Sequence, residues 1–214
     1  MATLGELKAD IADSIDDTEG EYDGQIGTAV AKAIRYCERE VYYFNQTRDE
    51  TFPTVDGQQW YDETDNANIP TLVHIERVWC EDASGDRDEV LRYRPEDLEQ
   101  LSDNSAARGE PYAYTYFNRQ IRIYPIPDAT VYTIRLQLAP YRLALLTGDE
   151  DENAWTTEGY DLVYARAKYI LAKDTLKDAI MAAEALNDYN DQHDVLKSET
   201  SKREATGVIV ATRF

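Results

Sequence analysis

The chain has 214 residues and a formal net charge of −20, because 42 acidic residues outnumber 22 basic ones. Its 43% hydrophobic content and 16 tyrosines are enough for a folded core and exclude a globally disordered chain. The acidic balance runs along the whole sequence and argues against a sequence-reading DNA-binding protein, which needs a basic surface. No run approaches the roughly 20 apolar residues of a membrane span, and we expect neither a membrane helix nor a signal peptide.

Two helices are predicted in the N-terminal part of the chain. Thr3 and Glu6 have the spacing of a capping box, in which each side chain accepts a hydrogen bond from the other residue's backbone N–H. Apolar residues at helical spacing mark one face of this helix: Leu4, Leu7, Ile11 and Ile15. A second helix is predicted over residues 25–45. Its apolar stripe comprises Ile26, Val30, Ala33, Cys37, Val41 and Phe44.

From about residue 49 the pattern changes to strands and turns. Strands are predicted in residues 51–61, 72–80, 112–117, 120–126 and 131–138. Asn118 and Arg119 are expected to join two of them as a hairpin, because asparagine tolerates positive φ. The last strand alternates cleanly, and its apolar face consists of Tyr132, Ile134, Leu136 and Leu138.

Three further helices are predicted. A short one covers residues 94–103, with Pro95 near its first position and Leu98 and Leu101 facing inward. After residue 154 the helical period returns in two stripes, and we place a break between them near Lys177 and Asp178. The first stripe comprises Tyr160, Val163, Tyr164, Ala167 and Leu171, and the second Ala182, Leu186, Tyr189, His193 and Leu196.

The order of elements predicts an α+β fold. We expect an antiparallel helical bundle formed by the N- and C-terminal helices, residues 1–48 and 155–203. A β-rich domain with one short helix, residues 49–154, would be inserted into that bundle. Residues 204–214 are expected to form an extended C-terminal arm.

The sequence contains no convincing catalytic or metal-binding motif. Residues 149–154, DEDENA, begin like a calcium loop, but Ala154 and Tyr160 stand where glycine and a bidentate glutamate are required. His74 and His193 fall in no metal-binding or catalytic motif. Cys37 and Cys80 are expected to be buried free thiols. We therefore expect no catalytic, cofactor-binding or metal residues and no enzyme, and we interpret the tyrosine clusters as core and assembly surface.

Several stretches resemble head-to-tail adaptor proteins of tailed bacteriophages. They are ATLGELKADIADSI, CEREVYYFNQTRDETFPTVDGQQWY, RQIRIYPIPDATVYTIRLQL and ENAWTTEGYDLVYARAKYIL. The resemblance covers roughly residues 3–200, with Arg119 at a turn position where the family usually has glycine. It implies a ring, most often of twelve subunits, that binds the portal protein, extends the DNA channel and offers a docking surface for a tail, nozzle or stopper protein. DNA would pass without specific binding, and the protein would lie in the virion neck after assembly in the bacterial host cytoplasm, with no role for a membrane.

The resemblance also gives a role to the terminal segment GVIVATRF, because family members use a C-terminal extension to grip the portal. An extended arm can add a strand to a sheet edge of its partner, with alternate side chains giving specificity. Val208, Val210 and Phe214 are the expected anchors and Arg213 a charge partner. The whole predicted portal-binding arm comprises Val208, Ile209, Val210, Ala211, Thr212, Arg213 and Phe214.

Three alternatives stay open at this point. The arm could fold back onto its own subunit. The same scaffold could act as a peptidoglycan hydrolase, which would need a carboxylic acid of raised pKa in a cleft, although 42 acidic residues make carboxylate pairs uninformative. Finally, the chain could be an unrelated soluble module that binds a small ligand through its tyrosines.

Overall fold

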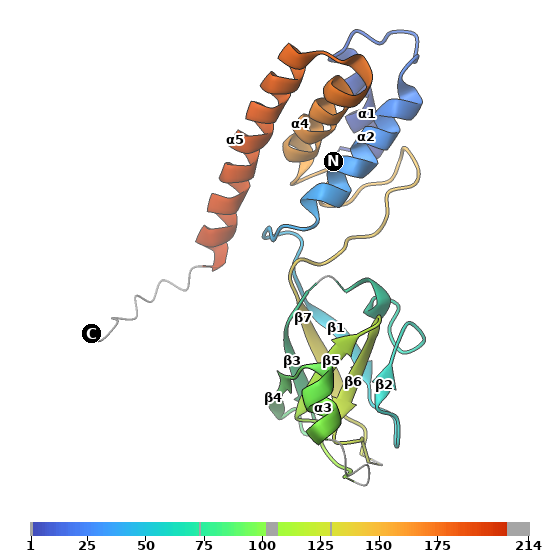
Figure 1. The fold of residues 1–214 in the computed structure, drawn as a ribbon, viewed down its shortest axis with the longest axis vertical. Coiled ribbons are helices and arrows are strands. Elements are labelled where there is room, and N and C mark those ends of the chain that lie inside the picture. The colour runs from blue at the N-terminus through green and yellow to red at the C-terminus, as the bar shows by residue number, and fades with distance from the viewer. Residues whose placement is uncertain (1, 73, 102–106, 129, 205–214) are drawn as a thin grey trace, which may run out of the picture. The chain divides into compact units, whose positions relative to one another are not determined.

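The computed structural model describes residues 2–72, 74–101, 107–128 and 130–204 (Figure 1). These residues form two compact units. One is helical and combines the chain up to Asn45 with the described chain from Leu143 on. The other extends from Gln46 to Arg142 and contains the β-sheet. None of the described helices is both long and apolar enough to span a membrane.

The helical unit is built on four α-helices and one short π-helical segment. Their bounds are α1 Leu4–Asp13, α2 Asp23–Cys37, α4 Tyr160–Leu171, η2 Ala172–Leu176 and α5 Ala179–Glu204. The predicted capping box is confirmed: Thr3 Oγ1 accepts from the Glu6 N–H, and the Glu6 carboxylate accepts from the Thr3 N–H at 2.9 Å. The predicted break is confirmed too, since Lys177 has φ 56° and ends the helical run before α5.

Helix α4 packs against both α2 and α5, which flank it in Figure 1. Its buried side chains meet apolar residues of α1 and α2 in one core, which Trp155 completes from the loop before α4. Tyr189 and Leu196 add the contribution of α5.

The α+β class fits the structure, but the predicted antiparallel bundle of N- and C-terminal helices is wrong. The described chain has five α-helices and a seven-stranded sheet, and one of the helices, α3 (Pro95–Leu101), belongs to the sheet unit. Helix α5 packs mainly on α4, because its buried positions form a single narrow stripe and the rest of its surface is polar. Helix α2 ends at Cys37, so the residues up to 45 form turns instead of a further length of bundle helix.

The sheet unit holds seven strands among its described residues. Their bounds are β1 Thr47–Pro53, β2 Trp60–Tyr61, β3 Ile75–Glu81, β4 Arg87–Arg92, β5 Ala113–Phe117, β6 Gln120–Tyr124 and β7 Thr133–Leu138. They follow the order β1-β7-β3-β4-β5-β6-β2, in which only the β4–β5 pair is parallel. A 3-10 turn, Ile69–Thr71, precedes β3. Apolar residues of the inner face, among them Phe52, Val78 and Ile134, form the core.

Two local predictions in this unit are confirmed. Asn118 and Arg119 connect β5 and β6 with φ of 50° and 65°, as a hairpin turn with two left-handed residues requires. In β7 the buried and half-buried residues alternate as expected. Leu98 of α3 is buried as predicted, whereas Leu101 keeps 38% of its surface exposed.

Candidate assembly surfaces

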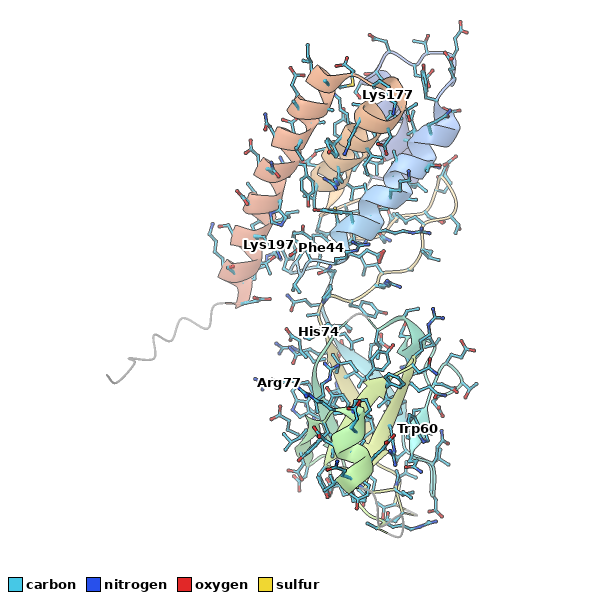
Figure 2. All side chains as sticks on the ribbon, viewed as in Figure 1. Phe44, Trp60, His74, Arg77, Lys177 and Lys197 are labelled. Atoms are coloured by element: carbon cyan, nitrogen blue, oxygen red, sulfur yellow. The ribbon has the colours of Figure 1, made fainter. Side chains whose placement is uncertain are left out.

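The predicted portal-binding arm lies outside the described residues. The described chain ends with α5, and the last turns of this helix are fixed to the loop after α2. The Tyr43 N–H donates to Thr200 Oγ1 at 3.0 Å, and Lys197 Nζ donates to Glu40 Oε2 at 2.8 Å and to the Val41 carbonyl at 3.1 Å. Figure 2 shows Lys197 close to the end of this loop that carries Phe44. The final described turns of α5 are thus held at a defined place on the helical unit.

Charge and aromatic contacts reinforce this attachment. The hydrogen bond from Lys197 lowers the pKa of the Glu40 carboxyl below its ordinary value. Lys197 Nζ also lies 5.2 Å from the ring centroid of Tyr42, and Arg203 Cζ lies 3.6 Å from that of Tyr43. Cations over aromatic faces contribute on the order of 0.5–1 kcal/mol each at exposed sites. The loop after α2 therefore holds the last turns of α5 in place, and we call its contacts with Lys197, Thr200 and Arg203 the bracket.

Buried polar and aromatic groups shape the loop itself. The Asn45 side chain, fully buried, accepts from the Tyr42 N–H at 2.7 Å and donates to the Glu40 carbonyl at 2.8 Å. The rings of Tyr42 and Phe44 stack at 5.5 Å, and both meet the Trp155 ring edge-on. Burial raises the pKa of the Tyr42 hydroxyl, so this ring stays neutral. The predicted tyrosine role in the core holds at this position.

The exposed face of α2 is basic. Lys32, Arg35 and Arg39 are all exposed, and their spacing of three and four residues places them on one side of the helix and its C-terminal turn. Among the described residues, none of the three is found in an ion pair, whereas ion pairs elsewhere in this unit include those of Lys8 with Asp149, of Lys197 with Glu40 and, when the imidazole is protonated, of His193 with Asp194. We call Lys32, Arg35 and Arg39 the basic face.

Helix α5 carries the opposite charge on its solvent side. Glu184, Asp188, Asp191 and Asp194 are exposed at steps of four, three and three residues. They lie outside the buried stripe of α5, which includes Ala185 and Tyr189, and Tyr189 belongs to the core of the helical unit. No lysine or arginine occurs in α5 before Lys197. We call these four carboxylates the acidic face.

Between the two faces, Arg166 of α4 is held by aromatic rings. Its guanidinium carbon lies 3.8 Å from the ring centroid of Tyr36, 5.0 Å from Tyr169 and 5.1 Å from Tyr189. Its Nε is buried and has no hydrogen-bond partner among the described residues. Tyr36, which keeps 41% of its surface exposed, covers the guanidinium from α2. The three tyrosine rings and the guanidinium thus connect α2, α4 and α5 through one set of contacts.

The outward face of the sheet holds two further cations, Arg48 and Arg77. Arg48, Arg77 and His74 line an open depression together with Trp79, Glu76 and Gln137. Figure 2 shows His74 and Arg77 on the same side of the sheet unit, away from Trp60. Next to them Arg135 pairs with Glu81 at 3.5 Å and with Asp49 at 3.7 Å. This surface is therefore mixed in charge.

The acidic residues of the calcium-like loop have structural roles. In the calcium-like loop, Asp151 Oδ2 accepts from the backbone N–H groups of Thr147 at 2.7 Å and Gly148 at 2.8 Å, and these bonds lower its pKa. Asp149 pairs with Lys8 at 2.7 Å, which ties the loop to α1. Within the ranges that the structure describes, no group of three or more His, Cys, Asp or Glu residues could hold a metal ion.

His193 packs between tyrosine rings, and both cysteines are buried thiols as predicted. The His193 ring centroid lies 6.0 Å from that of Tyr189 and 6.2 Å from that of Tyr42. Burial raises the pKa of Cys37 and of Cys80 to about 12, so neither thiol is a nucleophile at neutral pH.

Sequence reasoning had not singled out the basic and acidic faces. The sequence does contain the pattern that predicts them, because like charges recur at three- and four-residue steps in both helices. The net charge does not reveal this pattern, since the acidic excess is spread along the chain.

The sequence of both units matches a known protein family. The family model described as SU10 adaptor protein matches residues 2–211, which takes in both units and most of the predicted arm. No curated protein matches the chain.

Proposed function

The chain belongs to the SU10 adaptor protein family, a family of phage head-to-tail adaptors, and we propose that it forms a ring beneath the portal. As a bacteriophage adaptor it is a virion component, and the family implies contacts with portal and tail proteins in general. The ring, expected to have twelve copies, extends the DNA channel and presents the docking surface for the tail. The match over residues 2–211 is the observation that carries this proposal.

The charge of the chain supports a passage for DNA. A surface with a net charge of −20 per subunit repels phosphates, so a genome moving through a ring of such subunits meets walls to which it does not adhere. DNA is therefore cargo in this proposal, and the subunit needs no base-reading or phosphate-binding site.

The portal grip is assigned to the arm, Val208–Phe214. Its β-branched and aromatic residues suit a strand that is added to a sheet edge of the portal. The bracket around Thr200 and Lys197 supports this assignment, because an arm that follows a fixed helix end loses less entropy on binding. Copies in one ring add to one another through effective concentration.

Truncation after Thr206 tests the grip. We expect the shortened chain to keep its helical content and unfolding midpoint and to lose portal binding in a pull-down with purified portal protein. Phe214→Ala in the full chain should weaken binding by a smaller amount, and Ser201→Ala, an exposed position on α5, serves as the matched control. Portal binding by the truncated chain at wild-type strength would refute the role of the arm.

Family membership argues against the unrelated ligand-binding module and indicates a structural, non-enzymatic role. For the hydrolase alternative, Glu110 is the relevant carboxyl: its pKa is raised, first by desolvation and then by the charges of Asp88 and Asp82. Glu110 is nevertheless exposed, which is unlike the enclosed acid of a glycosidase. No observation favours this activity, and we do not propose it.

A further inference from the structure

We propose that the basic face of α2 in one copy docks on the acidic face of α5 in the next copy of this chain. The proposal rests on the ring described above and names the surfaces that join its subunits. The occupant of each face is thus a second copy of this chain, because the same molecule carries both complementary surfaces.

The basic face is available for a partner. Lys32, Arg35 and Arg39 are exposed, and no carboxylate of the described chain pairs with them. The same side of α2 carries Gly24 and Thr28, and a Cβ added at Gly24 would meet no atom within 4 Å. Small residues beside the cations leave room for another helix to approach the backbone closely.

The acidic face has matching dimensions. Glu184 and Asp191 are seven residues apart in α5, which is roughly 10 Å along the helix axis at 1.5 Å per residue. Lys32 and Arg39 are also seven residues apart, across the end of α2 and the turn that follows it. Ile180 and Val195, exposed by 75% and 53%, flank the carboxylates and add apolar area to the contact.

The spacing also selects a direction. The steps of the basic face are three and then four residues, whereas those from Glu184 through Asp188 to Asp191 are four and then three. The two series coincide when the helices run antiparallel. In that register Arg39 lies opposite Glu184, Arg35 opposite Asp188 and Lys32 opposite Asp191.

The two faces do not neutralise each other within one copy. Helix α4 packs between α2 and α5, which flank it in Figure 1, and no ion pair joins the two faces in the described chain. Between copies the contact is heterologous: one face of each subunit meets a different face of the next. Repetition of such a contact generates a closed ring when the rotation closes.

Charge reversal tests the proposal. In the first variant Lys32, Arg35 and Arg39 are changed to Glu; in the second, Glu184, Asp188 and Asp191 are changed to Lys. Self-association of each full-length variant at low ionic strength should be at least about tenfold weaker than that of the wild type, because like charges face each other. An equimolar mixture should recover association to within about threefold of the wild type, since each reversed face then meets its complement. Sedimentation equilibrium gives the association constants of the wild type, of the two variants and of the mixture.

Net charge provides the control. Reversing three cations takes the net charge from −20 to −26, and reversing three carboxylates takes it to −14, so non-specific electrostatics predicts that the two variants repel each other. A variant with Arg92, Arg94 and Arg119 changed to Glu also carries −26 and keeps both faces. It should associate with the wild type within about threefold of wild-type strength.

The outcomes separate this inference from the proposed function. The α2–α5 contact is overturned if either reversed variant associates as strongly as the wild type. It is also overturned if the mixture associates no more tightly than each variant alone. Either result counts against the contact even if the basic face is then found to bind DNA. The chain truncated after Thr206 keeps both faces and should self-associate like the wild type even though its portal binding is lost. Absence of association in the wild type and in the mixture, with portal protein present as well as without it, overturns the ring itself.

Discussion

The two buried cysteines make stability depend on pH at the alkaline end. Burial raises the pKa of both Cys37 and Cys80 to about 12, while an unfolded thiol has a pKa of about 8.5. Above that lower value the unfolded chain releases protons that the folded chain keeps. The free energy of unfolding is therefore unaffected by the thiols below about pH 8.5 and falls steadily as the pH rises toward 12.

Urea unfolding at pH 7.5, 8.5 and 9.5 measures this effect. We expect a lower midpoint at pH 9.5 than at pH 7.5, and a smaller difference in a variant with both cysteines changed to Ala. That variant starts from a lower stability, because each change leaves a cavity. The quantity to compare is therefore the change of the urea midpoint with pH in each chain. Equal wild-type midpoints at all three pH values would contradict the assignment. A thiol reagent supplies a second readout, since both thiols should react slowly until the chain unfolds.

At the level of secondary structure, the predictions that held depend on neighbouring residues. The Thr3–Glu6 capping box and the Asn118-Arg119 turn are decided within four residues, and both are confirmed. The helix predicted over residues 25–45 was too long, since Val41 and Phe44 continue the apolar spacing of α2. The chain leaves the helix after Cys37, and the Asn45 side chain closes the turn that follows.

The features that sequence reasoning missed depend on distant partners. Strand β4 has one buried residue, Val90, and is held by β3 on one side and by β5 in parallel on the other, neither of which can be seen in its own charged sequence. The prediction of an antiparallel bundle was wrong for the same reason, because the apolar stripe on α5 does not indicate which helix it packs against. Of the candidate site, the arm stays a prediction, and the two charged faces become meaningful only once α4 is known to separate them.

The β5–β6 hairpin allows a sharp test of one turn position. Arg119 has φ 65° and an exposed side chain, so it bears the strain of a left-handed residue without a packing role. Arg119→Gly should raise the free energy of unfolding by about 0.5–1 kcal/mol, because glycine adopts this conformation without that strain. Arg119→Ala removes the same charge but keeps the strain, and it should leave stability nearly unchanged. Chemical denaturation of the three chains decides the matter; an equal gain in the alanine variant would assign the effect to charge.

For the whole molecule, the charge of −20 makes salt act in opposite directions on folding and on assembly. The Debye length falls from about 30 Å at 0.01 M salt to about 8 Å at 0.15 M, which screens repulsion among exposed carboxylates throughout the subunit. We therefore expect the urea midpoint to rise over this range of NaCl. Over the same range the α2–α5 association should weaken, because the attraction between the two faces is screened as well. Parallel unfolding and sedimentation measurements give both slopes. A falling midpoint would mean that ion pairs such as Lys8–Asp149 outweigh the repulsion, and association that tightens with salt would assign the contact to apolar residues instead of charge.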